Sequence, residues 1–153
     1  MFLNNQLTDF SFLPEVDGKL VANSVAPGKR PRSSMTPVII FNQDGSFFAA
    51  LGSPGGPKII SYVAQTVIAL LDYDLNMQEA INLPRHVTTG KVLELEAGTP
   101  LTKLKPKLEA MGHEVVLKRQ HSGVHGIRLN KNHATEMIDG GADPRREGRV
   151  LTK

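Results

Sequence analysis

The sequence contains no cysteine, no tryptophan and only two tyrosines among its 153 residues. Without cysteine the chain forms no disulfide and offers neither a thiol nucleophile nor a cysteine-ligated zinc site. This absence leaves the redox compartment undecided. No apolar run approaches the roughly eighteen residues that cross a bilayer, so no membrane span is expected. Residues 1–6 lack the charged and apolar regions of a secretion signal, and the chain as written is expected to be soluble and unexported.

A strong charge of one sign is also lacking, because 18 Lys and Arg face 15 Asp and Glu and the net charge is +3. The basic clusters at 29–32 and 145–153 are not interleaved with aromatic residues, so we interpret them as solvated surface and expect no nucleic-acid partner. His121 and His125 are four residues apart, but Ser122 and Gly123 between them disfavour a helix that would align the two rings. We expect neither a metal site nor a cofactor.

The length and the hydrophobic content of 40% are those of an ordinary globular domain. A domain of this size buries roughly 70% of the surface that its unfolded chain exposes, which is enough for a sizeable core. We therefore predict a single domain over residues 1–153. Residues 1–36 carry turn signals and little periodicity, which predicts an extended arm, and residues 37–153 should form the sheet and helices.

Hydrophobic periodicity and turn signals predict the elements of the second part. The expected helices are one of about fourteen residues after Pro57, a short one capped by Asn76 and ended by Pro84, and one over 101–111 that Pro106 kinks or starts. The expected strands are 38–41 and 46–51 around an Asp-Gly turn, 92–95, 114–118, 124–129 and one near 134–138 after a turn at 130–132. Neighbouring strands joined by turns imply an antiparallel sheet with helices on a face, which is an α+β fold.

The most informative local pattern is a strand followed by Gly-Ser-Pro-Gly-Gly-Pro at 52–57 and then a helix. The start of a helix leaves backbone N–H groups unpaired, and Gly55 and Gly56 carry no side chain that would keep a ligand away from them. Such donors stabilise the negative charge that develops on a carbonyl oxygen during acyl transfer. The alternative interpretation is an ordinary tight turn between a strand and a helix.

Polar pairs earlier in the chain suggest a binding site for an amino acid. Gln6 and Asp9 lie three residues apart in a turn-like stretch, so an amide oxygen and a carboxylate can converge on an ammonium group. Ser33 and Ser34 stand between two prolines, where their hydroxyls can donate to a carboxylate. The alternatives are local capping by the first pair and an ordinary polar loop for the second. With an oxyanion turn, the pairs would suit a zwitterionic amino acid that carries a reacting acyl group.

Three blocks, in order, resemble the gamma-glutamyltransferase family: Leu-Asn-Asn-Gln-Leu-Thr-Asp-Phe-Ser at 3–11, Pro-Gly-Lys-Arg-Pro-Arg-Ser-Ser-Met-Thr-Pro at 27–37 and Gly-Ser-Pro-Gly-Gly at 52–56. Weaker similarity follows at 79–85, at 109–113 and at 142–145. The chain thus resembles the C-terminal part of the small subunit of these enzymes along nearly its whole length.

The resemblance implies the αββα sandwich of the N-terminal-nucleophile hydrolases, here in part. It implies that Gln6 and Asp9 hold the α-amino group of a γ-glutamyl substrate such as glutathione. Ser33 and Ser34 would hold its α-carboxylate, and Gly55 and Gly56 would form the oxyanion hole. The family cleaves γ-glutamyl amides through an acyl-threonine, transfers the acyl group to amino acids or water, and uses no cofactor.

No residue of the chain matches the catalytic threonine of the family, which the resemblance places upstream of residues 3–11. The expected partners are the large subunit and the missing N-terminal part of the small subunit, and the isolated chain is expected to be inactive. The resemblance favours a periplasmic or extracellular location. Two alternatives are a relative of the beta-lactam side-chain (cephalosporin) acylases and a non-catalytic remnant or interaction module. Retention of Asp9 favours a substrate with an α-amino group.

Overall fold

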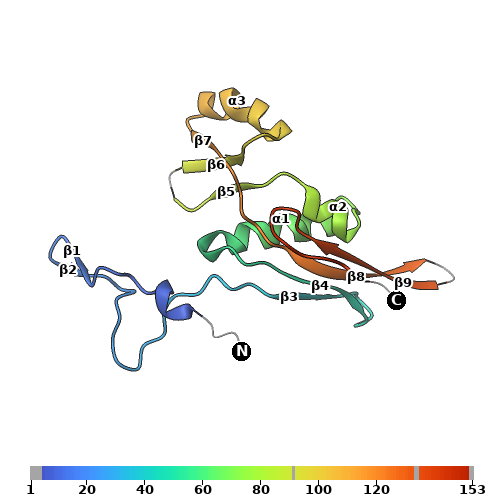
Figure 1. The fold of residues 1–153 in the computed structure, drawn as a ribbon, viewed down its shortest axis with the longest axis horizontal. Helices are drawn as coiled ribbons and strands as arrows, with labels where there is room; N and C mark the ends of the chain where they lie inside the picture. The colour runs from blue at the N-terminus through green and yellow to red at the C-terminus, as the bar shows by residue number, and fades with distance from the viewer. Residues whose placement is uncertain (1–4, 91, 133–134, 152–153) are drawn as a thin grey trace. The chain divides into compact units, whose positions relative to one another are not determined.

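The computed structural model of the chain describes residues 5–90, 92–132 and 135–151 (Figure 1). The chain divides into two compact units, Met1–Ser34 and Met35–Lys153. No helix within the described ranges is long and apolar enough to cross a membrane.

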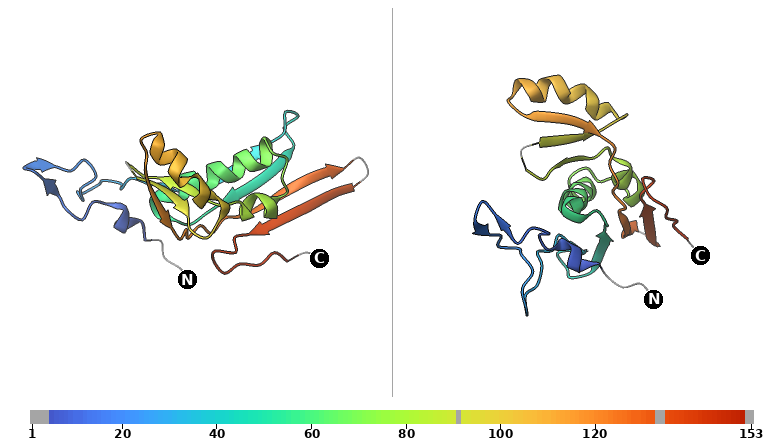
Figure 2. Two further views of the ribbon diagram at one scale, coloured as in Figure 1. Left: turned by 90° about the horizontal axis from the view of Figure 1, so that it is seen from above. Right: turned by 60° about the vertical axis from the view of Figure 1, so that its left-hand side comes forward.

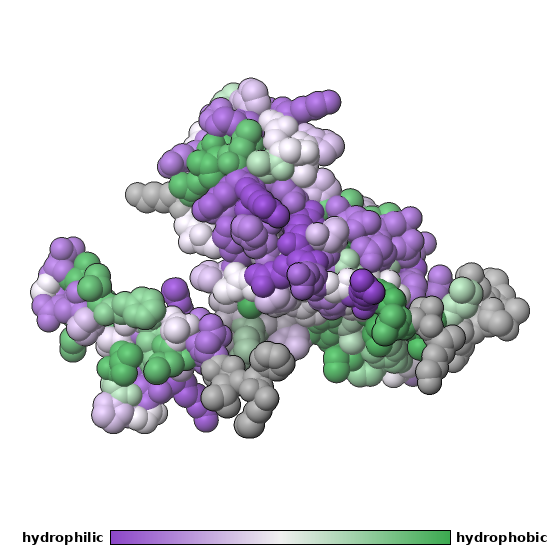
Figure 3. Space-filling view, in the orientation of Figure 1, coloured by the Kyte–Doolittle hydropathy of each residue, from purple (hydrophilic) through white to green (hydrophobic). Residues whose placement is uncertain are grey.

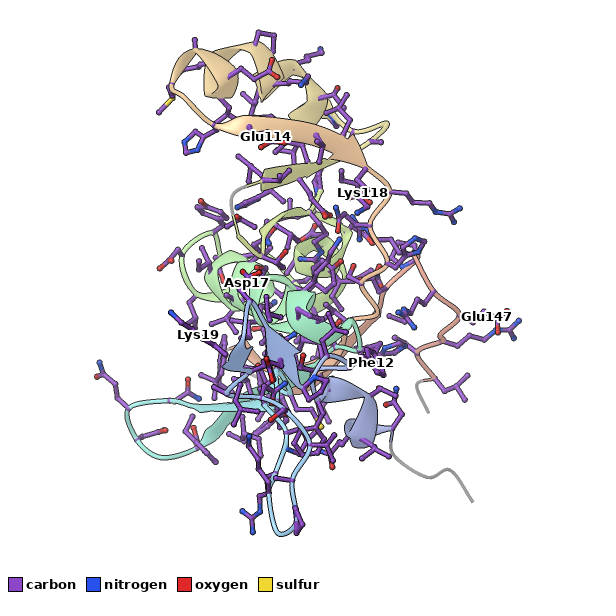
Figure 4. All side chains as sticks on the ribbon, turned by 90° about the vertical axis from the view of Figure 1, so that its left-hand side faces the viewer. Phe12, Asp17, Lys19, Glu114, Lys118 and Glu147 are labelled. Atoms are coloured by element: carbon purple, nitrogen blue, oxygen red, sulfur yellow. The ribbon has the colours of Figure 1, made fainter. Side chains whose placement is uncertain are left out.

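The first unit is a turn-rich segment with little regular structure. It contains the 3₁₀ turn η1 (Gln6–Asp9) and a small hairpin of β1 (Glu15–Val16) and β2 (Lys19–Leu20). Asp17, labelled in Figure 4, and Gly18 form the hairpin turn with φ angles of 51° and 71°, in the left-handed region that aspartate and glycine tolerate best. Phe10 is buried, and Ser11 pairs with Ser24 in an isolated bridge.

The main sheet of the second unit has four antiparallel strands in the order β3-β4-β8-β9. The strands are β3 (Val38–Phe41), β4 (Phe47–Gly52), β8 (His125–Asn132) and β9 (Thr135–Ala142). The hairpin predicted at 38–51 is confirmed, and its turn contains Gly45 at a φ of 80°. The turn predicted at 130–132 is wrong, because these residues continue β8 and pair with residues 135–137 of β9. Ala134, where the last strand was expected to begin, lies outside the described residues.

Two helices, α1 (Ile59–Leu71) and α2 (Met77–Asn82), cover one face of this sheet (Figure 2). Both were predicted, and Asn76 caps α2 in a capping box with Glu79. Glycines let α2 approach the sheet closely, since a Cβ atom on Gly126 would lie 2.6 Å from the sulfur of Met77. The core between the helices and the sheet consists of Ala49, Leu51, Ile59, Tyr62, Val63, Ala69, Leu70, Met77, Ala80, Ile81, Val87 and Val124.

A smaller sheet of β5 (His86–Thr88), β6 (Val92–Glu96) and β7 (Glu114–Lys118) adds a further layer. In this sheet β5 and β6 pair antiparallel, as expected of strands joined by a turn, whereas β6 and β7 are parallel. Their connection is a crossover through η3 (Pro100–Leu104) and α3 (Lys105–Ala110), and such a crossover returns the chain in the same direction. The helix predicted over 101–111 is therefore two segments, with Pro106 in the first turn of α3.

The face of the main sheet opposite α1 and α2 is apolar and exposed. Ile39, Ala50 and Ile127 lie in register across β3, β4 and β8, and the two isoleucines are 63% and 45% exposed. Apolar surface gathers over this region in Figure 3. A sheet face of this kind is normally buried by another layer of structure.

Candidate functional site

The turn that the sequence singled out, Gly55–Gly56, connects β4 to α1. Gly55 and Gly56 have φ angles of 144° and 55°, which glycine adopts without a Cβ clash. The 3₁₀ turn η2 (Gly56–Lys58) follows, and the Lys58 N–H donates to the Gly55 carbonyl at 3.3 Å. Among the residues that the structure describes, no acceptor is paired with the N–H of Gly55 or of Gly56. Two adjacent donors are therefore available to an oxygen atom of a ligand.

The loop that leads from β7 to β8 holds the first half of this turn in place. The Ser53 hydroxyl accepts a hydrogen bond from the Gly123 N–H at 3.2 Å and donates to the Pro54 carbonyl at 2.7 Å. A Cβ atom on Gly123 would lie 2.8 Å from Cγ of Pro54, so this position has room only for glycine. The turn is thus fixed against a loop some seventy residues later in the chain.

Buried charged groups fix that loop in turn. Asp143 is almost fully buried and accepts hydrogen bonds from the Ser122 hydroxyl at 2.5 Å and the Val124 N–H at 3.2 Å. Arg145 donates to Asp143 at 3.1 Å and makes two hydrogen bonds to Glu96, at 2.6 and 2.7 Å. Burial alone would raise the pKa of Asp143, but these hydrogen bonds hold it below its ordinary value. Asp143 is therefore an anion at neutral pH.

Arg85, which is fully buried, balances part of this negative charge. Its guanidinium donates to the Thr66 hydroxyl at 3.1 Å and the Ile81 carbonyl at 2.9 Å, and lies 3.9 Å from Asp143. Within the described ranges its Nε has no hydrogen-bond partner. Burial and the neighbouring charge of Arg145 lower the pKa of Arg85 to about 10, so it remains charged at neutral pH. Arg85, Asp143, Arg145 and Glu96 thus form one buried cluster, which the ion pairs of Arg85 and Arg145 hold together.

Glu94 on β6 connects the small sheet to the end of η2. Its carboxylate binds the Lys58 ammonium and accepts hydrogen bonds from Gln120 at 3.0 Å and Lys118 at 3.3 Å. Burial would raise the pKa of Glu94, but these three donors lower it to about 2.

This depressed pKa makes the stability of the chain depend on acid. A carboxyl group with a lowered folded-state pKa stabilises fully above its unfolded pKa, near 4.5, and loses that contribution as the pH falls toward 2. Because both lysines are partly exposed, we expect a loss of about 2 kcal/mol of unfolding free energy over this window. Urea unfolding at pH 6 and pH 2.5 measures it. The free energy of unfolding of Glu94→Gln should differ correspondingly less between these pH values. A difference as large as that of the unchanged chain would show that Glu94 is not the source of the acid dependence.

In the first unit, Gln6 and Asp9 lie at the two ends of η1. Among the described residues, none forms a hydrogen bond or ion pair with the Asp9 carboxylate. The carboxylate is therefore available to bind a cationic group of a ligand. The Asn23 amide donates to the Asp9 carbonyl at 2.7 Å and accepts from the Arg32 N–H at 2.9 Å. Asn23 thus connects η1 to the segment that continues into Ser33 and Ser34.

The predicted site residues therefore fall into two groups, one in each unit of the chain. Gln6, Asp9, Ser33 and Ser34 belong to the first unit, where Asn23 links their two segments, and Gly55 and Gly56 form one turn of the second. The structural roles of Asn23, Arg85, Asp143 and the residues around Glu94 are not apparent from the sequence. Only the similarity at 79–85 and 142–145 pointed toward the two arginine-bearing segments. In the described part of the chain, no group of three or more His, Asp or Glu residues is arranged to hold a metal ion.

Comparisons with known proteins show to which family the chain is similar. A sequence model of the family described as Gamma-glutamyltranspeptidase matches residues 1–152. The Glutathione hydrolase proenzyme of Escherichia coli (strain K12) is 41% identical over 152 residues, which are 95% of this chain and 25% of that protein. The Acylase ACY 1 proenzyme of Pseudomonas sp. (strain SE83) is 37% identical over 131 residues, 85% of this chain and 22% of that protein.

A solved structure of a gamma-glutamyltranspeptidase mutant from Helicobacter pylori superposes with a TM-score of 0.79 at 34% identity, covering 94% of this chain and 81% of that chain. The predicted α+β fold, that of the N-terminal-nucleophile hydrolases, is thereby confirmed. The chain spans about a quarter of the length of the curated relatives it matches. With the family model matched over almost every residue, the chain belongs to the gamma-glutamyltranspeptidase family.

Proposed function

We propose that this chain supplies the donor-binding and oxyanion-binding part of an enzyme that cleaves γ-glutamyl amides such as glutathione. The observation that carries the proposal is the turn at Gly55 and Gly56, which has two positive φ angles and two N–H groups that no described residue accepts from. Family membership and the similarity to a glutathione hydrolase proenzyme support the same chemistry.

The proposed reaction assigns a separate role to each group of residues. A threonine hydroxyl, assigned to a segment outside these 153 residues, adds to the γ-carbonyl carbon of the substrate. The Gly55 and Gly56 N–H groups bind the oxygen that becomes negative as this bond forms. The amine then leaves with a proton, and water or an amino acid releases the acyl group from the threonine.

The remaining predicted residues would orient the donor. Asp9 and Gln6 would accept hydrogen bonds from its α-ammonium group, and Ser33 and Ser34 would donate to its α-carboxylate. Holding both ends of the amino acid would restrict the orientations that the donor can take. The partly buried Asp9 carboxylate, with its lack of a described partner, supports this role.

The exposed apolar face of the main sheet supports a partner for this chain. Ile39 and Ile127 on that face would be buried by a second sheet, as in the sandwich of the family. We assign that layer to the large subunit and the N-terminal part of the small subunit.

Two other functions follow from the same fold. The similarity to the Acylase ACY 1 proenzyme supports a side-chain acylase of the cephalosporin type, acting on a donor without the α-amino group. A non-catalytic remnant or interaction module would use the apolar face alone. The three candidates differ in which anilide, if any, they cleave.

A chimaera tests them, in which this chain replaces the matching quarter of the Escherichia coli relative. We expect the chimaera to release nitroaniline from γ-glutamyl nitroanilide and not from glutaryl nitroanilide, which lacks the α-amino group. The reverse preference would favour the acylase. A folded chimaera without either activity would favour the non-catalytic module.

The role of Asp9 gives a more specific prediction. In the active chimaera, Asp9→Asn should lower kcat/KM for the γ-glutamyl substrate by about ten- to a hundredfold, because it removes a charge-assisted hydrogen bond of about 1.5–3 kcal/mol. Asp17→Asn is the matched control in the same unit, since it removes an exposed charge at a positive φ that asparagine also tolerates. Equal kcat/KM values for the two variants would remove Asp9 from the site.

A further inference from the structure

A closed ring of side-chain contacts begins and ends at the Gly55–Gly56 turn. The aromatic side chain of Tyr62 packs against Gly55, since a Cβ atom on Gly55 would lie 2.8 Å from Cε2 of Tyr62. The Tyr62 hydroxyl donates to the Gln120 amide oxygen at 2.9 Å, and the Gln120 amide donates to Glu94 at 3.0 Å. The same Glu94 oxygen binds the Lys58 ammonium, and Lys58 is the last residue of the η2 turn.

The members of this ring are held firmly enough to transmit position. Tyr62 and Gln120 are each 1% exposed, and each uses its polar group in a hydrogen bond to the next member. The Glu94 side chain is 12% exposed, so its ion pair with Lys58 is only weakly screened by solvent. Tyr62 belongs to α1, Glu94 to β6 and Gln120 to the loop after β7. The ring of contacts therefore joins the Gly55–Gly56 turn to the small sheet.

We propose that Tyr62, Gln120, Glu94 and Lys58 are positioning residues that set the direction of the Gly55 and Gly56 N–H groups, so that the β5-β6-β7 sheet controls the oxyanion geometry. This inference rests on the proposed function of the turn. It gives the small sheet a role, although none of its residues belongs to the predicted site.

Two lysines on Glu94 provide a matched test. Lys58 belongs to the turn, whereas Lys118, labelled in Figure 4, ends β7 and binds the same carboxylate from outside the ring. Lys58→Met and Lys118→Met each remove one ammonium group from Glu94 and keep an aliphatic side chain. A merely stabilising role of Glu94 predicts that both variants lower the free energy of unfolding, Lys58→Met more because Lys58 is the less exposed partner, and that neither changes the Gly55–Gly56 turn. A positioning role predicts an effect of Lys58→Met alone on this turn.

The first measurement uses the 153-residue chain and ¹⁵N relaxation of its glycine amides. In the unchanged chain and in Lys118→Met, we expect order parameters of about 0.85 at Gly55 and Gly56, as in rigid backbone. In Lys58→Met and Tyr62→Phe they should fall toward about 0.6, while Gly126 in β8 stays unchanged. Unchanged values at the turn in both of these variants would overturn the inference, whatever the activity of the enzyme.

The second measurement uses the chimaera and separates kcat from KM. Lys58→Met and Tyr62→Phe should lower kcat for γ-glutamyl nitroanilide about tenfold and change KM less than about twofold, since misdirected oxyanion donors act only in the transition state. Equal losses for Lys118→Met would overturn the inference. An inactive unmodified chimaera would contradict the proposed function instead, and the order parameters would still decide the positioning role.

Discussion

Replacement of Asp143 by alanine is expected to lower the free energy of unfolding by about 3–5 kcal/mol, the usual effect of removing one partner of a buried ion pair. Arg85 has no exposed surface, and at neutral pH it would keep its charge with one fewer anion nearby. The Ser122 hydroxyl and the Val124 N–H would also lose their acceptor. Urea unfolding of the chain at pH 7 measures the loss.

Two variants separate the causes of this loss. Asp143→Asn keeps an acceptor oxygen of nearly the same shape, so it should show the loss that arises from charge alone, smaller than that of Asp143→Ala. Glu109→Ala breaks the exposed ion pair with Lys105 on α3 and should cost about 0–1 kcal/mol. If Asp143→Ala cost no more than Glu109→Ala, the buried cluster would contribute nothing to folding.

The fold could be predicted from the sequence wherever the signal is local. The hairpin at 38–51 has an Asp-Gly turn between two apolar strands, and α1 and α2 have apolar periodicity with a proline and an asparagine at their starts. The parallel pairing of β6 with β7 and the full length of β8 depend on partners elsewhere in the chain. Strand β5 has three residues, too few to show a period.

The same distinction applies to the candidate site. The Gly55–Gly56 turn was predicted because strand, glycines and helix are consecutive in the sequence. The ring around it was not, because Tyr62 and Gln120 are 58 residues apart and Gln120 and Glu94 are 26 apart. Nothing near Gln120 in the sequence marks it as a partner of Tyr62. The ligand contacts of Gln6, Asp9, Ser33 and Ser34 stay predictions that the chimaera tests.

Replacement of Gly55 by alanine is expected to reduce the kcat of the chimaera by at least about a hundred- to a thousandfold, which is the effect of losing a single oxyanion donor. The φ of Gly55 is 144°, and the new methyl group would lie 2.8 Å from the Tyr62 ring. Both the backbone and the ring must shift, which turns the Gly55 and Gly56 N–H groups away from the substrate oxygen. Steady-state kinetics with γ-glutamyl nitroanilide measure the loss, and KM should change little.

Two other glycines distinguish this effect from backbone strain alone. Gly98→Ala introduces a methyl group at a φ of 75° outside the site, and Gly56→Ala does so at 55° within it, and both positions have open space around the added atom. Gly98→Ala should leave kcat unchanged. Gly56→Ala strains the backbone but places its methyl group in open space, so its loss of kcat should be clearly smaller than that of Gly55→Ala. The turn must move to accept the new methyl group, because Tyr62 occupies the space beside Gly55. A Gly55→Ala variant with full kcat would therefore show that these N–H groups do not bind the oxyanion.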